Sequence, residues 1–290
     1  LAVTAKRGRL EGWPLLLWLL PLLVVAVGIR ARVRQPLRLL LSRPALAFRA
    51  VLAMYVALPA FALLLIWLLP LPASVAAVLL GFAVAPVLPP WAKNGSAVGG
   101  KDNYVIGIEL LSALVALLLV PIFIWLISRM FGVATRLDPL AVEGVLLITF
   151  AVPLAVGMAI TRHFPDAAPQ IARIADRLGG TLVVIEGVLI FFVHGRAVLD
   201  VIGQGTLVAI VAMVLFGLVI GHALGGPHAG NRGALASATV SRHPAVALLL
   251  ASAAFPEQQT AVMGAVLLYL AAALLVTIPY ERWRESMAIR

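Results

Sequence analysis

Arg242 and His243, preceded by Ser241, interrupt a stretch of otherwise apolar and small residues at 233–254. If this stretch crosses a membrane, its arginine costs about 2.5–3.5 kcal/mol on insertion scales, so such a residue indicates a functional site. A buried guanidinium beside exposed helix N-termini suits a carboxylate, sulfonate or phosphate group. We therefore expect Arg242, His243 and Ser241 to bind an anionic substrate. The alternative is that Arg242 pairs with a buried glutamate only to hold the helices together.

Two glutamates lie in other apolar stretches. Glu109 is about one turn into 104–128, and Glu186 is near the middle of 179–194. Because removal from water favours the proton-bound form of a carboxyl group, each is a candidate to load and release a coupling proton. Each is also a candidate partner for Arg242. The alternative for both is a hydrogen-bonded packing residue.

A polar segment follows three prolines within the stretch 72–101 and includes Trp91, Asn94 and Ser96. Its polar groups could donate hydrogen bonds to an anion at the inner mouth of a cavity. We therefore expect these three residues to contribute to substrate binding, the alternative being a solvated loop.

The composition indicates what kind of protein carries these residues. Of the 290 residues, 63% are hydrophobic and 12% are charged, with a mean hydropathy of +1.08. Soluble domains have about 45–50% apolar and about 25% charged residues, so the chain is predicted to be a polytopic helical membrane protein. The net charge of +10 comes from basic residues in short connections, which indicates the positive-inside rule rather than binding to nucleic acid.

Enzyme and metal chemistry have no support in the sequence. The chain has no cysteine, which excludes disulfides, thiol catalysis and cysteine-ligated metals. It also lacks a dinucleotide fingerprint, a phosphate loop, zinc-ligand spacing and a nucleophile elbow. We expect no catalytic residue, no cofactor and no metal, and we expect His222 and His228 to be solvated loop residues.

Nine apolar runs are predicted to form membrane helices, because lipid cannot satisfy bare backbone groups. They are 12–29, 47–69, 72–101, 104–128, 141–161, 179–194, 201–222, 233–254 and 259–279. Residues 163–178 are amphipathic and are expected to form an interfacial connector. Alternate connections carry 14 lysines and arginines on one side against 6 on the other. This asymmetry predicts an external N-terminus and a cytoplasmic C-terminus in a bacterial-type inner membrane.

Two of these runs are expected to be broken helices. Three prolines interrupt 72–101, and Pro244 follows His243 in 233–254. Proline lacks an N–H donor and disfavours helix in the residue before it. Broken helices at corresponding places in two halves indicate the binding site of a secondary transporter.

Four segments of the chain resemble, in order and spacing, motifs of the bile acid:sodium symporter family. They are Tyr55–Pro59, Gly81–Pro86, Val152–Gly157 and Asn231–Ala247. The resemblance implies an inverted-repeat fold of ten helices in which the fourth and ninth are unwound and cross near the midplane. It implies panel helices at 12–29, 141–161 and 179–194, and core helices at the other six runs. The nine runs then correspond to helices two to ten, and a helix preceding Leu1 would explain the basic N-terminus.

The chain departs from the family pattern at both breaks. The segment from Pro86 to Ala92 lacks the family's Ser-Asn pair, Ala238 stands where the family has a glutamate, and Arg242-His243 stands where it has Gln-Asn. Sodium needs several hard oxygen ligands, and an arginine side chain cannot be one. We therefore expect the family's sodium sites not to be preserved.

The sequence thus predicts a secondary active transporter that moves a small organic anion by alternating access, coupled to protons or uncoupled. Its expected partners are the substrate, the lipid bilayer and a coupling proton or sodium ion. Two alternatives are a sodium-coupled symporter with altered ligands, and a non-transporting membrane sensor or partner protein on the same fold. A membrane-embedded enzyme is a further class, without a supporting motif.

Overall fold

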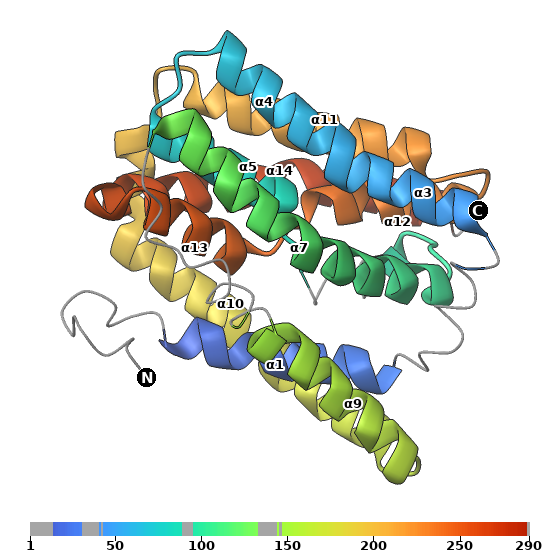
Figure 1. The fold of residues 1–290 in the computed structure, drawn as a ribbon. Coiled ribbons are helices and arrows are strands. Elements are labelled where there is room, and N and C mark those ends of the chain that lie inside the picture. Colours follow the sequence, from blue (N-terminus) through green and yellow to red (C-terminus); the bar gives the residue numbers. More distant parts are fainter. Residues whose placement is uncertain are drawn as a thin grey trace.

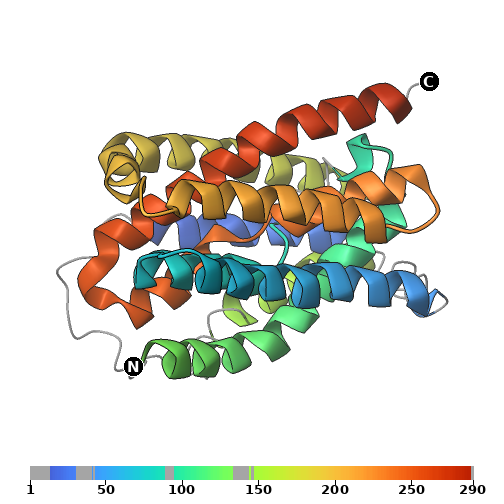
Figure 2. The same ribbon diagram turned by 90° about the horizontal axis from the view of Figure 1, so that it is seen from above.

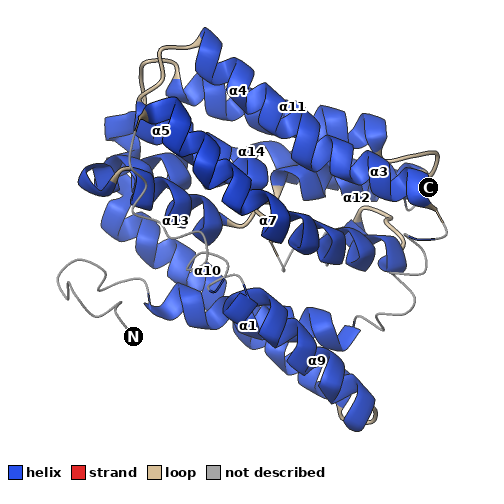
Figure 3. Ribbon diagram, in the orientation of Figure 1, coloured by secondary structure: helices blue, strands red, loops and turns tan. Residues whose placement is uncertain are grey.

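The computed structural model describes residues 14–30, 41, 43–88, 95–132, 144 and 147–288, and nearly all of these residues are helical (Figures 1 and 3). The helices are α1 (Pro14–Arg30), α3 (Pro44–Val51), α4 (Leu58–Leu68), α5 (Ala73–Val84), α7 (Asp102–Phe131), α9 (Val152–His163), α10 (Ala168–Val201), α11 (Thr206–Leu224), α12 (Ala229–Val240), α13 (Pro244–Ala254) and α14 (Gln259–Ala288). A short 3₁₀ turn, Pro256–Gln258, precedes α14.

Within the described residues, four helices are long and apolar enough to cross a membrane: Pro44–Leu68, Asp102–Phe131, Thr206–Leu224 and Pro256–Met287. Three shorter apolar helices accompany them, namely Pro21–Arg30, α5 and α13. This architecture confirms the predicted all-α, multi-pass membrane protein. Continuous apolar runs form helices because a helix satisfies its own backbone hydrogen bonds in lipid.

Two prolines are accommodated by widened helical turns. α3 continues through a π-helical segment, Leu52–Ala57, into α4, whose second residue is Pro59. A second π-helical segment, Leu147–Ala151, leads into α9, whose second residue is Pro153. Because proline removes a backbone donor and its ring crowds the preceding turn, the wider turn lets the chain remain helical.

The helices form two groups. α1, α9 and the first part of α10 lie together at the bottom of Figure 1, and α1 contacts both α9 and α10. The other helices form the larger body, in which α5 packs on α13, and α11 packs on α12 and α14. α10 contacts both groups because it also packs on α14. Seen from above, α14 runs along the larger body to the C-terminus (Figure 2).

The main hydrophobic core lies in the larger body and surrounds the ends of α5 and α12. Phe82 of α5 stacks on Tyr269 of α14, with ring centroids 3.8 Å apart. The Tyr269 hydroxyl donates a hydrogen bond to the carbonyl oxygen of Val240, the last residue of α12. The core therefore fixes the ends of two helices that stop inside the protein.

Two boundaries differ from the sequence predictions. The expected interfacial connector at 163–178 is largely the first part of α10, which runs without interruption from Ala168 to Val201. Its proline lies at the start, where a helix tolerates it, and the Gly179-Gly180 pair does not stop it. α14 extends past the predicted end at residue 279 to Ala288, because its last turns pack on α12.

Candidate site at the helix crossing

The two predicted breaks are confirmed, and they meet. α5 ends at Val84 and α12 ends at Val240, and the residue after each helix, Ala85 or Ser241, leaves the helical conformation. Each extended segment is followed or interrupted by proline, which disfavours helix in the residue before it. The structure thus places two interrupted helices against each other at the centre of the larger body.

The extended segments pair as a short antiparallel bridge between Val87 and Arg242. The backbone N–H of Leu88 donates to the carbonyl oxygen of Ser241 at 2.9 Å, and that of His243 donates to Pro86 at 2.9 Å. These bonds satisfy backbone groups that the broken helices leave unpaired, as non-helical backbone at membrane depth requires.

Arg242 is 1% exposed, and its guanidinium donates to three main-chain carbonyls among the described residues. Nε lies 3.2 Å from the oxygen of Phe82, while Nη2 lies 3.0 Å from that of Ala83 and 3.4 Å from that of Met54. The guanidinium carbon is 4.7 Å from the ring centroid of Tyr55. Phe82 and Ala83 are in the last turn of α5, where helix carbonyls lack intrahelical partners.

One edge of the guanidinium is free. Within the described residues, Nη1 of Arg242 is buried and has no hydrogen-bond partner, and neither has Nδ1 of His243. Ser241, which is partly buried, contributes its main chain to the bridge. The three residues expected at this break therefore lie together at the crossing.

Ser112 of α7 joins three elements around the crossing. Its Oγ accepts a hydrogen bond from the backbone N–H of Val87 at 3.2 Å and donates to the carbonyl of Glu109 at 2.8 Å. Its carbonyl accepts from the Tyr55 hydroxyl at 2.6 Å. The serine thereby ties the first broken helix to α7 and to the segment that carries Tyr55.

Glu109 is fully buried, and neither of its carboxyl oxygens has a hydrogen-bond partner among the described residues. It is not the partner of Arg242, whose contacts are the carbonyls named above. If Arg242 has only a structural role, that role is therefore to bind the C-terminal end of α5 rather than to pair with Glu109.

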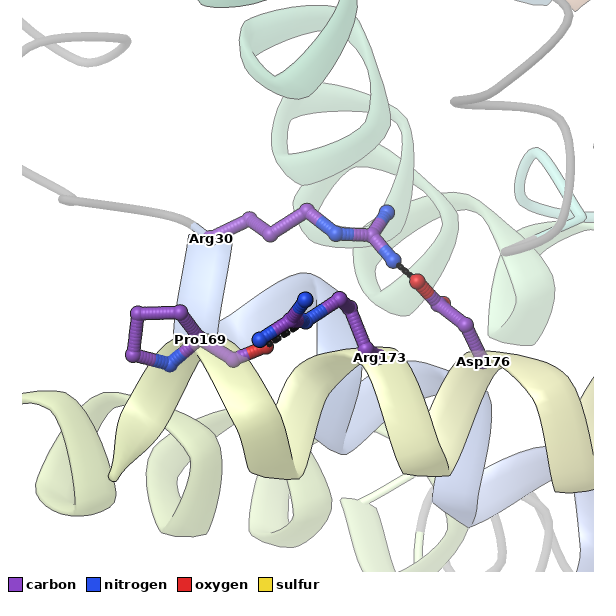
Figure 4. Close-up of polar contacts among 4 residues, drawn as sticks. All are labelled: Arg30, Pro169, Arg173 and Asp176. Carbon is purple, nitrogen blue, oxygen red and sulfur yellow. Dashed lines mark hydrogen bonds and ion pairs between the residues drawn. The ribbon is translucent and has the colours of Figure 1, made fainter. Parts of the chain in front are cut away.

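Arg30, the last residue of α1, forms an ion pair with Asp176 of α10 (Figure 4). One turn earlier on α10, Nε of Arg173 donates to the carbonyl of Pro169 at 3.3 Å. The ion pair thus holds the end of α1 to α10.

The other expected site residues are not gathered at the crossing. Oγ of Ser96 donates to Asp102 at 2.7 Å, which places it beside the start of α7. Trp91 and Asn94 lie outside the described residues. Glu186 belongs to α10, but its side chain is not among those described.

Sequence reasoning missed two polar contributors, Tyr55 and Ser112. Ser112 follows Glu109 by three residues and so shares its helix face, a spacing that could have linked the two. Tyr55 begins one of the four family-like segments, but no role at the site was predicted for it. Its ring faces Arg242 and its hydroxyl donates to Ser112. The feature of the sequence that could have indicated this role is a tyrosine within an apolar run, four residues before a proline.

A second polar cluster lies where α11, α12 and α14 meet. Ser237 hydrogen-bonds Glu281, Arg284 donates to the carbonyl of Ala229 at 2.6 Å, and His222 hydrogen-bonds the Tyr280 hydroxyl at 2.7 Å. The prediction that His222 is a solvated loop residue is therefore wrong, because it belongs to the last turn of α11 and packs against α14. His228 is exposed and precedes α12.

Comparison with known proteins gives one positive finding. The model of the sodium bile acid symporter family matches residues 17–204. This region is more than half of the chain and includes α5, the first break and Glu109, while the second break lies beyond it. A search of curated proteins finds no match.

Proposed function

Because the chain belongs to the sodium bile acid symporter family, we propose that it is a secondary transporter that carries a small organic anion across the membrane by alternating access. The observation that carries this proposal is the crossing of two interrupted helices around a fully buried arginine. Sites of this kind, formed where membrane helices are broken, bind substrates in many secondary transporters.

The anion would bind at the free edge of Arg242. An arginine has five N–H donors, and those on Nε and Nη2 are directed at the carbonyls of Met54, Phe82 and Ala83. The two donors on Nη1 remain for a carboxylate or sulfonate. α13 begins at Pro244, so its positive N-terminal end adds favourable potential for an anion. His243 and Ser241 complete this part of the site, and Trp91, Asn94 and Ser96 are proposed at its inner mouth.

Coupling is proposed to run through Glu109. An ionised carboxylate buried without a partner costs several kcal/mol, so the arrangement favours the form that carries a proton. Glu186 is the second candidate for the same role. In this proposal the family's sodium coupling is replaced by proton coupling or by uncoupled transport.

The proposed orientation has the N-terminus outside and the C-terminus in the cytoplasm of an inner membrane, because 14 lysines and arginines then lie on the inner side against 6 outside. The moving units are proposed to be α1, α9 and α10 as the panel, and the remaining helices as the core.

The test is uptake into proteoliposomes of radiolabelled taurocholate and of a panel of smaller carboxylates and sulfonates, under an imposed pH or sodium gradient. We expect at least one probe to accumulate faster with an inward proton gradient, and sodium to have no effect. The Glu109→Gln variant cannot carry the proton, so its uptake should lose the response to the pH gradient. Glu257→Gln, which alters an exposed glutamate, is the matched control and should keep the response.

Two outcomes contradict the proposal. Accumulation driven by sodium alone would mean a sodium-coupled symporter with altered ligands. Saturable binding of a probe without accumulation, in a protein correctly inserted in the vesicles, would mean a membrane sensor that uses a transporter fold.

A further inference from the structure

The oxygens around Arg242 form the kind of cluster that binds a cation. Carbonyls of Met54, Phe82 and Ala83 all lie within 3.4 Å of its guanidinium nitrogens, although Met54 is remote from the other two in the chain. The face of the Tyr55 ring adds a fourth electron-rich surface, 4.7 Å from the guanidinium carbon. Among the described residues, no carboxylate lies within ion-pair distance of this arginine.

The position of the cluster explains why a cation is needed there. α5 and α12 both end at the crossing, and each helix C-terminus carries about −0.5 elementary charge. Together the two ends amount to about −1, of which the N-terminal end of α13 at Pro244 offsets about half, and neither C-terminal end can reach bulk water because the surrounding residues are buried. A single positive charge at this point stabilises both ends, and Arg242 supplies it.

We propose that Arg242 is a built-in cation that occupies a monovalent cation site formed by the carbonyls of Met54, Phe82 and Ala83. The side chain takes the place that a sodium ion would otherwise take among these oxygens, so the crossing needs no free cation. Removing the guanidinium exposes the carbonyls, which then bind sodium in its place. This inference does not depend on transport, since it concerns what holds the crossing together.

The donor set supports this assignment. Carbonyl oxygens replace the hydration shell of monovalent cations in membrane proteins, and they are hard ligands of the type sodium prefers. In this chain the three oxygens already accept hydrogen bonds from Arg242, so a sodium ion does not fit among them while the arginine is present.

The experiment measures apparent melting temperatures of the purified protein in sodium chloride and in choline chloride at equal ionic strength. The variants are Arg242→Gln, Arg242→Ala and Arg242→Lys. Arg284→Gln is the matched control, because Arg284 is also a buried arginine that donates to a main-chain carbonyl but lies in the cluster at the other end of α12.

We expect the wild type to melt at the same temperature in the two salts, and Arg284→Gln to be equally indifferent to the choice of salt. Arg242→Gln and Arg242→Ala should melt lower in choline and regain several degrees as sodium is titrated, with saturation. Arg242→Lys keeps a positive charge and should stay near the wild type, insensitive to sodium.

Three results would overturn the inference: identical melting of Arg242→Gln and Arg242→Ala in sodium and choline, an equal sodium response in the wild type, or equal destabilisation by Lys and Gln. If the neutral variants do not survive solubilisation, the same salts are compared in native membranes by heating and measuring the fraction that remains extractable. The comparison of Arg242→Lys with Arg242→Gln still applies there. If the variants are destabilised because the shape of arginine is lost rather than its charge, both should lose the same extractable fraction.

Discussion

At the scale of single residues, the crossing depends on a few polar groups that each serve more than one element. Ser112 is the clearest case, since its hydroxyl and its carbonyl contact the first broken segment, α7 itself and Tyr55. A backbone N–H buried without a partner is costly, and the hydroxyl of Ser112 is the partner of Val87.

The Ser112→Ala variant should therefore lower the free energy of unfolding by about 1–3 kcal/mol, because the N–H of Val87 loses its acceptor. Ser74→Ala is a matched control. Ser74 is also fully buried, but its hydroxyl has no hydrogen-bond partner among the described residues, so its removal should leave stability unchanged or raise it. Thermal unfolding of both variants checks this, and equal effects would show that the Ser112 bond contributes nothing.

At the scale of elements, small residues allow the helices to pack closely. Gly28 of α1 and Gly157 of α9 face each other, and a Cβ atom on Gly157 would collide with the carbonyl oxygen of Val25. Glycine is required here because the two backbones touch, an arrangement common between membrane helices. Gly180 of α10 differs, since a Cβ atom added there would meet open space.

Gly157→Ala should destabilise the protein by about 1–3 kcal/mol, because α9 must move away from α1. Gly180→Ala should instead stabilise it by about 0.5–1 kcal/mol, since alanine costs less entropy than glycine in a helix. Melting temperatures of the two variants should move in opposite directions. A shift of the same sign in both would mean that α1 and α9 do not pack as closely as described.

At the scale of the whole molecule, α10 packs on α14 of the larger body, whereas α1 and α9 make few contacts with that body. One of them is a small apolar cluster of Val24 on α1, Ala113 on α7 and Leu154 on α9. A second small cluster, which includes Ile29 of α1 and Ala172 of α10, lies within the first group alone. Relative movement of the two groups would therefore disrupt the first cluster and leave the second intact.

Because the chain has no cysteine, this movement can be tested by cross-linking. Joining Val24→Cys to Ala113→Cys with a short bifunctional thiol reagent should abolish uptake of whichever anion the wild type accumulates, while binding of that anion remains. The pair Ile29→Cys and Ala172→Cys, cross-linked in the same way, should leave uptake unchanged. Unimpaired uptake in the first pair would exclude movement of these groups against each other.

Much of the fold could be predicted from the sequence, because hydropathy and proline act locally. Apolar runs must be helical in lipid, and Pro86 and Pro244 mark the two breaks, although Pro121 and Pro279 lie inside helices that continue past them. Arg242 and Glu109 could also be picked out in this way, since a charged residue in an apolar run differs sharply from its neighbours in the chain.

Only the tertiary structure decided what these residues contact. The oxygen of Phe82 that accepts from Arg242 is 160 residues away in the chain, and no local pattern specifies that pairing. The isolation of the Glu109 carboxyl and the placement of His222 against Tyr280 likewise depend on how separate helices pack. Propensity and hydropathy are properties of neighbouring residues, whereas the partner of a buried polar group is set by elements that meet only in the folded protein.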